Sequence, residues 1–217
     1  MSQKVEGFPA SAVVYHFHPI AFVEQMRRVV GKEDIDLSDP DKWISQWTQP
    51  NAKVACWRTC VLILKEYGVE GGGLGRKLNE TYRNGTNKWS NVIQTVVQLQ
   101  DGTLIGTGRE QEGLDYLDSQ LEKGRPVIVG LDDGRRITTY NKDNSTEHFV
   151  VITGRLTDEK GLYYRFFEVG TKVKNKMTWG VSLDNKLRKN EFDWLVGLKR
   201  NVLPNREYTV TEIRKNN

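Results

Sequence analysis

The residue types needed for cysteine-based amide hydrolysis follow one another along this chain. Cys56 precedes an apolar run that ends at Tyr67 and Gly68, His148 opens a second apolar run, and Glu168 lies near the end of a third. A thiol, an imidazole and a carboxylate can supply a nucleophile, its base and a group that orients the base. The sequence therefore predicts a cysteine-dependent hydrolase with the catalytic residues Cys56, His148 and Glu168.

Cys56 stands at the predicted N-terminus of a helix. Unpaired backbone N–H groups and the positive end of the helix dipole favour the thiolate at such a position. Cys60, one turn further on, is predicted to be an inert packing residue. A disulfide between the two would have to span four residues of one helix, near the upper limit of its geometry, so both are predicted to be free thiols made in a reducing compartment. The alternative is that Cys56 is also a core cysteine, a common fate of free thiols.

His148 and Glu168 are predicted to face each other across a β-hairpin. The apolar runs 148–153 and 162–169 flank the turn-forming residues 157–161, and each side chain lies about nine positions from the centre of that turn. A carboxylate beside a histidine can fix its tautomer and stabilise the imidazolium. The alternatives are a structural histidine and an ordinary cross-strand polar residue.

An oxyanion would need hydrogen-bond donors beside the nucleophile. The backbone N–H of Cys56 is one candidate. Gln49, seven residues upstream, is the predicted side-chain donor, and Gln46 is the second choice. A loop glutamine without a special role is the alternative for either residue.

The remaining pattern predicts an α+β fold in which the helix carrying the cysteine packs on an antiparallel sheet. Helices are expected at residues 55–68 and 114–123, ended by Gly68 and Gly124. Strands are expected at residues 126–130, 148–153 and 162–169, and further strands near 179–181, 194–196 and 208–210.

Residues 1–45 are predicted to be a separate N-terminal segment, and residues 46–217 the catalytic domain. Apolar residues recur at helical spacing between Ile20 and Val30, and Gly31 ends the pattern. This segment is interpreted as a helix with a possible role in delivery of the protein.

Composition narrows the classes of partner. The chain has 217 residues, 37% of them hydrophobic, which is enough for one core, and 32 basic against 28 acidic residues give a net charge of +4. No recognised nucleic-acid motif accompanies this charge, so no nucleic-acid partner is expected. No run approaches the ~18 apolar residues of a membrane span. The N-terminus lacks the pattern of a secretory signal, and a soluble chain without a membrane partner is expected.

At these residues the chain resembles the papain-like superfamily, and is most similar to its bacteriocin-processing peptidases and cell-wall amidases. The similarity covers Cys56, Cys60 and the Tyr-Gly that follows, the segment from Leu121 to Val129, and the strand opened by His148. It implies a papain-like fold, no cofactor, no metal, and a peptide or peptidoglycan substrate. The chain departs from these bacterial groups at Trp57, where they often carry glycine, and at Glu168, where Asp or Asn is usual. Gln49 also lies one residue further from the cysteine than the oxyanion glutamine of papain.

The segment from Tyr15 to Phe22 is similar to effectors and tip components of contractile, type VI-like secretion systems. This resemblance implies an antibacterial toxin that cleaves amide bonds in the peptide stems of peptidoglycan. It also implies synthesis in a bacterial cytoplasm without a signal peptide, delivery into the periplasm of a target cell, and an immunity protein as partner.

Three other interpretations remain open at the level of sequence. The same scaffold could carry a cysteine protease that acts on proteins. It could also be a non-catalytic binding or structural component of a secretion or phage-tail particle. A metal site built from Cys56, Cys60, His16 and His18 is the third, although these spacings match no strong zinc pattern.

Overall fold

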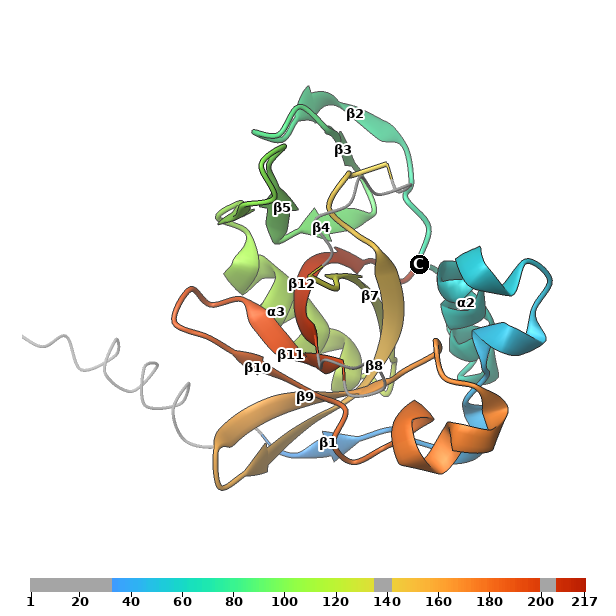
Figure 1. Ribbon diagram of the computed structural model, residues 1–217. Coiled ribbons are helices and arrows are strands. Elements are labelled where there is room, and N and C mark those ends of the chain that lie inside the picture. Colours follow the sequence, from blue (N-terminus) through green and yellow to red (C-terminus); the bar gives the residue numbers. More distant parts are fainter. Residues whose placement is uncertain (1–32, 135–141, 200–205) are drawn as a thin grey trace, which may run out of the picture. The chain divides into compact units, whose positions relative to one another are not determined.

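The computed structural model describes residues 33–134, 142–199 and 206–217 (Figure 1). The chain divides into two compact units between Glu33 and Asp34, and the second unit is the one described below. The predicted helix at residues 20–30 and the segment from Tyr15 to Phe22 lie outside the described residues. Within the described ranges, no helix is both long enough and apolar enough to span a membrane.

A closed, barrel-like antiparallel sheet forms the centre of this unit. In the described part of the chain, six strands pair in the ring β8-β7-β12-β11-β10-β9, and β9 pairs back onto β8. The ring consists of β7 (Val127–Asp132), β8 (His148–Asp158), β9 (Gly161–Phe167), β10 (Lys186–Lys189), β11 (Leu195–Lys199) and β12 (Arg206–Arg214). Two short strands extend it, β1 (Ile35–Asp36) beside β8 and β4 (Val92–Gln94) beside β12.

The two faces of β7 and β8 pack into different apolar clusters, because successive side chains on a strand point to opposite faces. Val129 and Val150 belong to a cluster that includes α3 (Glu110–Leu121). Ile128 and Phe149 belong to a second cluster that includes α2 (Cys56–Glu66). These strands are apolar on both faces, as expected for a sheet with a helix packed against each face.

Each helix ends where the sequence predicts a glycine stop. Gly68 follows α2 with φ 68°, and Gly124 follows α3 with φ 71°. This left-handed conformation favours glycine. α2 lies against β8 and β7 (Figure 1). α3 is joined to β8 by a buried ion pair, in which Arg155 Nη1 lies 3.1 Å from Asp118 Oδ1.

Shorter elements surround the sheet. Two hairpins pair β2 (Lys77–Thr81) with β3 (Asn87–Trp89), and β5 (Val96–Gln98) with β6 (Leu104–Gly106). The short helical turns are η1 (Pro40–Lys42), η2 (Gln46–Thr48), η3 (Ala52–Val54), η4 (Val173–Asn175) and η5 (Lys176–Gly180).

The α+β class with an antiparallel sheet is confirmed, and the helices predicted at residues 55–68 and 114–123 form. The strand predicted near residues 179–181 is wrong, because Trp179 and Gly180 belong to the helical turn η5. The carbonyls of both residues accept hydrogen bonds from Asn185 Nδ2, at 2.7 and 3.2 Å. Gly180 also packs against the Trp43 ring so closely that a Cβ atom there would lie 2.7 Å from it.

Residues 34–45 belong to the same compact unit as the sheet, whereas the sequence analysis placed them in the N-terminal segment. Ile35 pairs with Arg155 and Asp36 with Gly154 on β8. Trp43 is 7% exposed and lies in the cluster that α2 shares with the sheet. Residues 34–45 therefore pack with the sheet in the unit Asp34–Asn217.

Candidate active site

Cys56 is the first residue of α2, directly after the turn η3 and the N-cap residue Ala55. The Cys56 side chain is partly exposed and packs at the margin of the α2 cluster. The first N–H groups of a helix have no partner within the helix. Cys60 is fully buried one turn later, and burial raises the pKa of its thiol well above the usual value. Cys60 is therefore placed as the packing residue that the sequence predicts.

The surroundings of Cys56 favour its thiolate. Burial alone would raise the pKa of the Cys56 thiol, whereas a hydrogen bond and the charge interaction with His148 lower it. Backbone hydrogen bonds from Trp57 and Phe149 lower the pKa in the same direction. The net pKa of Cys56 lies below its usual value, the shift expected for a reactive cysteine.

His148 is the first residue of β8 and is 7% exposed. Burial alone would lower the pKa of His148, but the charge of Glu168 and hydrogen bonds with Cys56 and Glu168 raise it to about 9. The lowered pKa of Cys56 and the raised pKa of His148 together favour a thiolate beside an imidazolium.

Glu168 follows β9 directly and its carboxylate lies against the histidine. Glu168 Oε1 is 2.7 Å from His148 Nε2. The β8–β9 register pairs Val151 with Phe167, so His148 and Glu168 lie near the open end of the same hairpin. This contact confirms the predicted approach of the two side chains across the hairpin.

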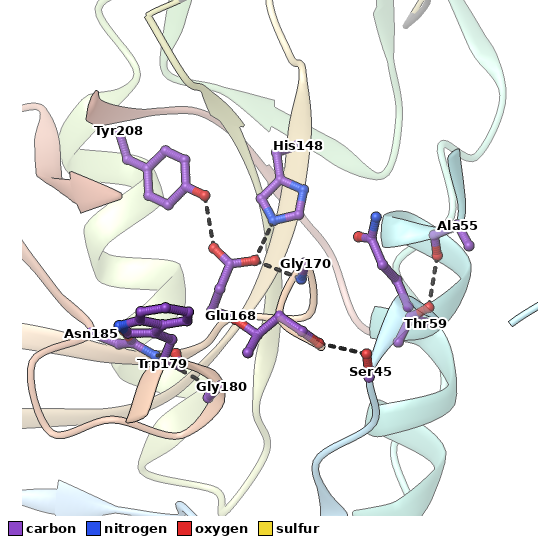
Figure 2. A network of polar contacts seen from close by, with 12 residues as sticks. Ser45, Ala55, Thr59, His148, Glu168, Gly170, Trp179, Gly180, Asn185 and Tyr208 are labelled. Atoms are coloured by element: carbon purple, nitrogen blue, oxygen red, sulfur yellow. Dashed lines mark hydrogen bonds and ion pairs between the residues drawn. The ribbon is translucent and has the colours of Figure 1, made fainter. Parts of the chain in front are cut away.

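Further donors hold the Glu168 carboxylate in place (Figure 2). The Gly170 N–H donates to Oε1 at 2.6 Å, and the Tyr208 hydroxyl donates to Oε2 at 2.7 Å. A carboxylate only accepts hydrogen bonds. The His148 Nε2 atom must therefore carry a proton when Glu168 is ionised, and this leaves Nδ1 as the ring nitrogen that can exchange a proton with Cys56.

The backbone around Glu168 is hydrogen-bonded to residues 43–47 through the four successive carbonyl groups of residues 168–171. The Glu168 carbonyl accepts from Trp43 Nε1 at 3.1 Å, and the Val169 carbonyl accepts from the Gln46 N–H at 2.9 Å. The next two carbonyls, of Gly170 and Thr171, accept from Trp47 Nε1 at 2.7 Å and from Ser45 Oγ at 2.5 Å. This fastening fixes the position from which Glu168 reaches His148.

The two glutamines considered as oxyanion donors differ in their surroundings. The Gln49 side chain is partly exposed, and its Nε2 donates to Thr48 Oγ1 at 3.1 Å. Gln46 is 7% exposed, and its Nε2 donates to the Ala52 carbonyl at 3.0 Å, at the turn that leads into Cys56. An amide nitrogen has two N–H groups, so Gln46 retains one donor beside that turn.

The metal interpretation gains no support from the described residues. No group of three His, Cys, Asp or Glu side chains there is arranged to hold a metal ion, and both cysteines are free thiols. His16 and His18 lie outside the described residues.

Sequence reasoning missed the residues that hold Glu168, namely Tyr208, Gly170, Trp43, Ser45 and Trp47. Buried Tyr and Trp side chains usually hydrogen-bond through their polar atoms. That rule marks Trp43 and Tyr208 as candidates for polar contacts, but it does not identify their partners.

The described residues thus form an α+β unit that joins a helix-borne thiol to a buried His–Glu pair. No family model, curated protein or solved structure matches this chain.

Proposed function

We propose that this protein is a papain-like cysteine hydrolase that cleaves amide bonds in peptides. The observation that carries the proposal is the linked set of Cys56, His148 and Glu168, in which the pKa of Cys56 is lowered and the pKa of His148 is raised. A cysteine that only packs in the core has no need of a lowered pKa. The pKa of the buried Cys60 thiol is raised instead.

The proposed reaction has two stages. The Cys56 thiolate attacks the amide carbonyl carbon, forming the C–S bond while the carbonyl oxygen becomes an oxyanion. The imidazolium of His148 then gives a proton to the leaving nitrogen as the C–N bond breaks. Water, deprotonated by His148, then attacks the carbonyl carbon of the resulting thioester, and the C–S bond breaks. This releases the acid and regenerates the Cys56 thiolate and the His148 imidazolium. The Cys56 N–H is the proposed backbone donor to the oxyanion, and the amide of Gln49 or of Gln46 is the proposed side-chain donor.

Peptidoglycan peptide stems are the proposed substrate, and the proposed role is that of an antibacterial effector opposed by an immunity protein. The resemblance of the residues around Cys56, Leu121 and His148 to those of cell-wall amidases suggests this substrate. Trp47 and Trp57 are 43% and 41% exposed on segments that adjoin the site, and such aromatic side chains suit contact with a peptide.

The decisive experiment measures alkylation of Cys56 by iodoacetamide as a function of pH. Trypsin separates the two thiols, because it cuts after Lys53, Arg58 and Lys65, so Cys56 and Cys60 fall in different peptides. Reaction of Cys56 should persist well below the ordinary thiol pKa of ~8.5 and should lose this advantage in His148→Ala. Ordinary thiol behaviour that is indifferent to His148 would exclude the enzyme and leave a binding or structural module.

Hydrolysis is then measured on purified peptidoglycan fragments and on a denatured protein, with Cys56→Ala as the inactive control. New amine termini on the peptide stems alone support the cell-wall substrate. Cleavage of the protein alone would instead support the protease alternative.

A further inference from the structure

We infer that Tyr208 is a positioning residue of the proposed reaction, which holds Glu168 in the orientation that His148 requires. The inference rests on the proposed function, because it assigns a role within the same site. It adds to the Cys–His–Glu set a residue forty positions further along the chain, on a strand outside the β8–β9 hairpin.

The hydroxyl of Tyr208 contacts the carboxylate oxygen that does not face the histidine. Tyr208 Oη donates to Glu168 Oε2 at 2.7 Å, while Oε1 contacts His148 Nε2 and the Gly170 N–H. A carboxylate held at both oxygens cannot rotate without losing a hydrogen bond. Glu168 is 3% exposed, so water does not easily replace a lost donor there.

The ring of Tyr208 is itself held firmly. Tyr208 is fully buried on β12, which pairs with β7 on one side and β11 on the other. Its ring stacks beside His148 with centroids 6.0 Å apart and planes 27° apart, and it meets Phe166 edge-on at 6.2 Å. A rigid donor of this kind can define the position of its acceptor, whereas a mobile side chain cannot.

Tyr208→Phe removes the hydroxyl and keeps the ring. Tyr164→Phe is the matched control, because Tyr164 is 2% exposed in the same apolar cluster and its hydroxyl also donates to a carboxylate, Asp118 Oδ1 at 2.8 Å. Both variants lose one buried hydrogen bond to an acid, but only Tyr208→Phe changes the surroundings of Glu168.

We expect Tyr208→Phe to slow Cys56 alkylation at about pH 6 by about tenfold, and to lower kcat by a similar factor with KM unchanged. Tyr164→Phe should match the wild-type protein in both measurements. In a Glu168→Gln background the further change Tyr208→Phe should have little additional effect, because a residue that acts through Glu168 loses its influence with the carboxylate.

The outcomes separate this inference from the proposed function. The positioning role is wrong if wild-type Cys56 is activated and Tyr208→Phe reacts like the wild-type protein. It is also wrong if Tyr208→Phe has the same effect in the Glu168→Gln background as in the wild-type protein. In both cases the proposed hydrolase function still stands. If wild-type Cys56 behaves as an ordinary thiol, the proposed function fails and the role of Tyr208 falls with it.

Discussion

The protonation state of His148 depends on which ring nitrogen faces Glu168 and which one faces Cys56. Nε2 lies 2.7 Å from Glu168 Oε1, so the carboxylate holds the Nε2 proton and leaves Nδ1 for the thiol. Without Glu168 a buried imidazole would favour its neutral form, because burial disfavours charge. The carboxylate therefore makes it possible for His148 to exist as an imidazolium beside the Cys56 thiolate.

The proposed roles of Cys56 and His148 predict a bell-shaped pH dependence of hydrolysis. Activity should rise with pH as Cys56 loses its proton, at a pH below the ordinary thiol pKa of ~8.5, because the pKa of Cys56 is lowered. It should fall again as His148 loses the proton needed by the leaving amine, near its pKa of about 9. Steady-state rates across the pH range test both limbs.

Alkylation of Cys56 provides the internal control for this profile. It needs the thiolate but no proton donor, so it should not decline on the alkaline side where hydrolysis does. Hydrolysis that stays constant well above the pKa of His148 would contradict its role as the acid.

The sequence allowed prediction of Cys56, His148 and Glu168, because each is tied to a local pattern: a helix start or the two arms of one hairpin. The contact between Tyr208 and Glu168 depends on the closure of the sheet, which joins β12 to the hairpin through other strands. No local periodicity encodes such a pairing.

The segment after β9 is closely held at Gly170. Gly170 donates its N–H to Glu168 Oε1, and its carbonyl accepts from Trp47 Nε1. A Cβ atom at Gly170 would lie 2.8 Å from Glu168 Oε1 and 3.3 Å from His148 Cε1. Glycine is needed here for space beside the His148–Glu168 pair.

Gly170→Ala should therefore lower kcat by about 100-fold, because a misplacement of about 1 Å in an active site has an effect of this order. Gly73→Ala is the matched control, since a Cβ atom there would meet nothing within 4 Å. Steady-state kinetics and urea unfolding are measured on both variants. Equal kcat values for the two variants would show that the Glu168 carboxylate has room to move.

Helices and strands could be predicted where the apolar residues recur at a regular spacing and a glycine or a turn ends the pattern, as α2, α3 and the β8–β9 hairpin show. The error near Trp179 arose because a short apolar run does not distinguish a strand from a helical turn. The turn is determined by distant contacts, above all that of Gly180 with the Trp43 ring.

On the scale of the described unit, the site depends on three parts of the chain that are far apart in sequence. The sheet supplies His148 and Tyr208, α2 supplies Cys56, and residues 43–47 fasten the backbone around Glu168. Residues 35 and 36 pair with β8 and residues 43–47 hydrogen-bond to the backbone around Glu168, so both groups belong to the unit that begins at Asp34.

Two truncations test this account of the unit. A chain of residues 34–217 keeps β1, Trp43 and Ser45, and should show the stability and the Cys56 alkylation profile of the full chain. A chain of residues 46–217 loses these contacts. Because Trp43 is a buried core residue, the shorter chain should lose more than about 3 kcal/mol in the free energy of unfolding.

The shorter chain should also lose the enhanced reactivity of Cys56 at low pH, since the Glu168 carbonyl no longer has Trp43 Nε1 as its partner. Urea unfolding gives the stability, and iodoacetamide alkylation reports the site in whatever fraction remains folded. Residues 34–45 would prove dispensable if the two truncated chains unfolded at the same urea concentration and reacted alike. A loss confined to 46–217 would instead establish that residues 34–45 form part of the folded unit that activates Cys56.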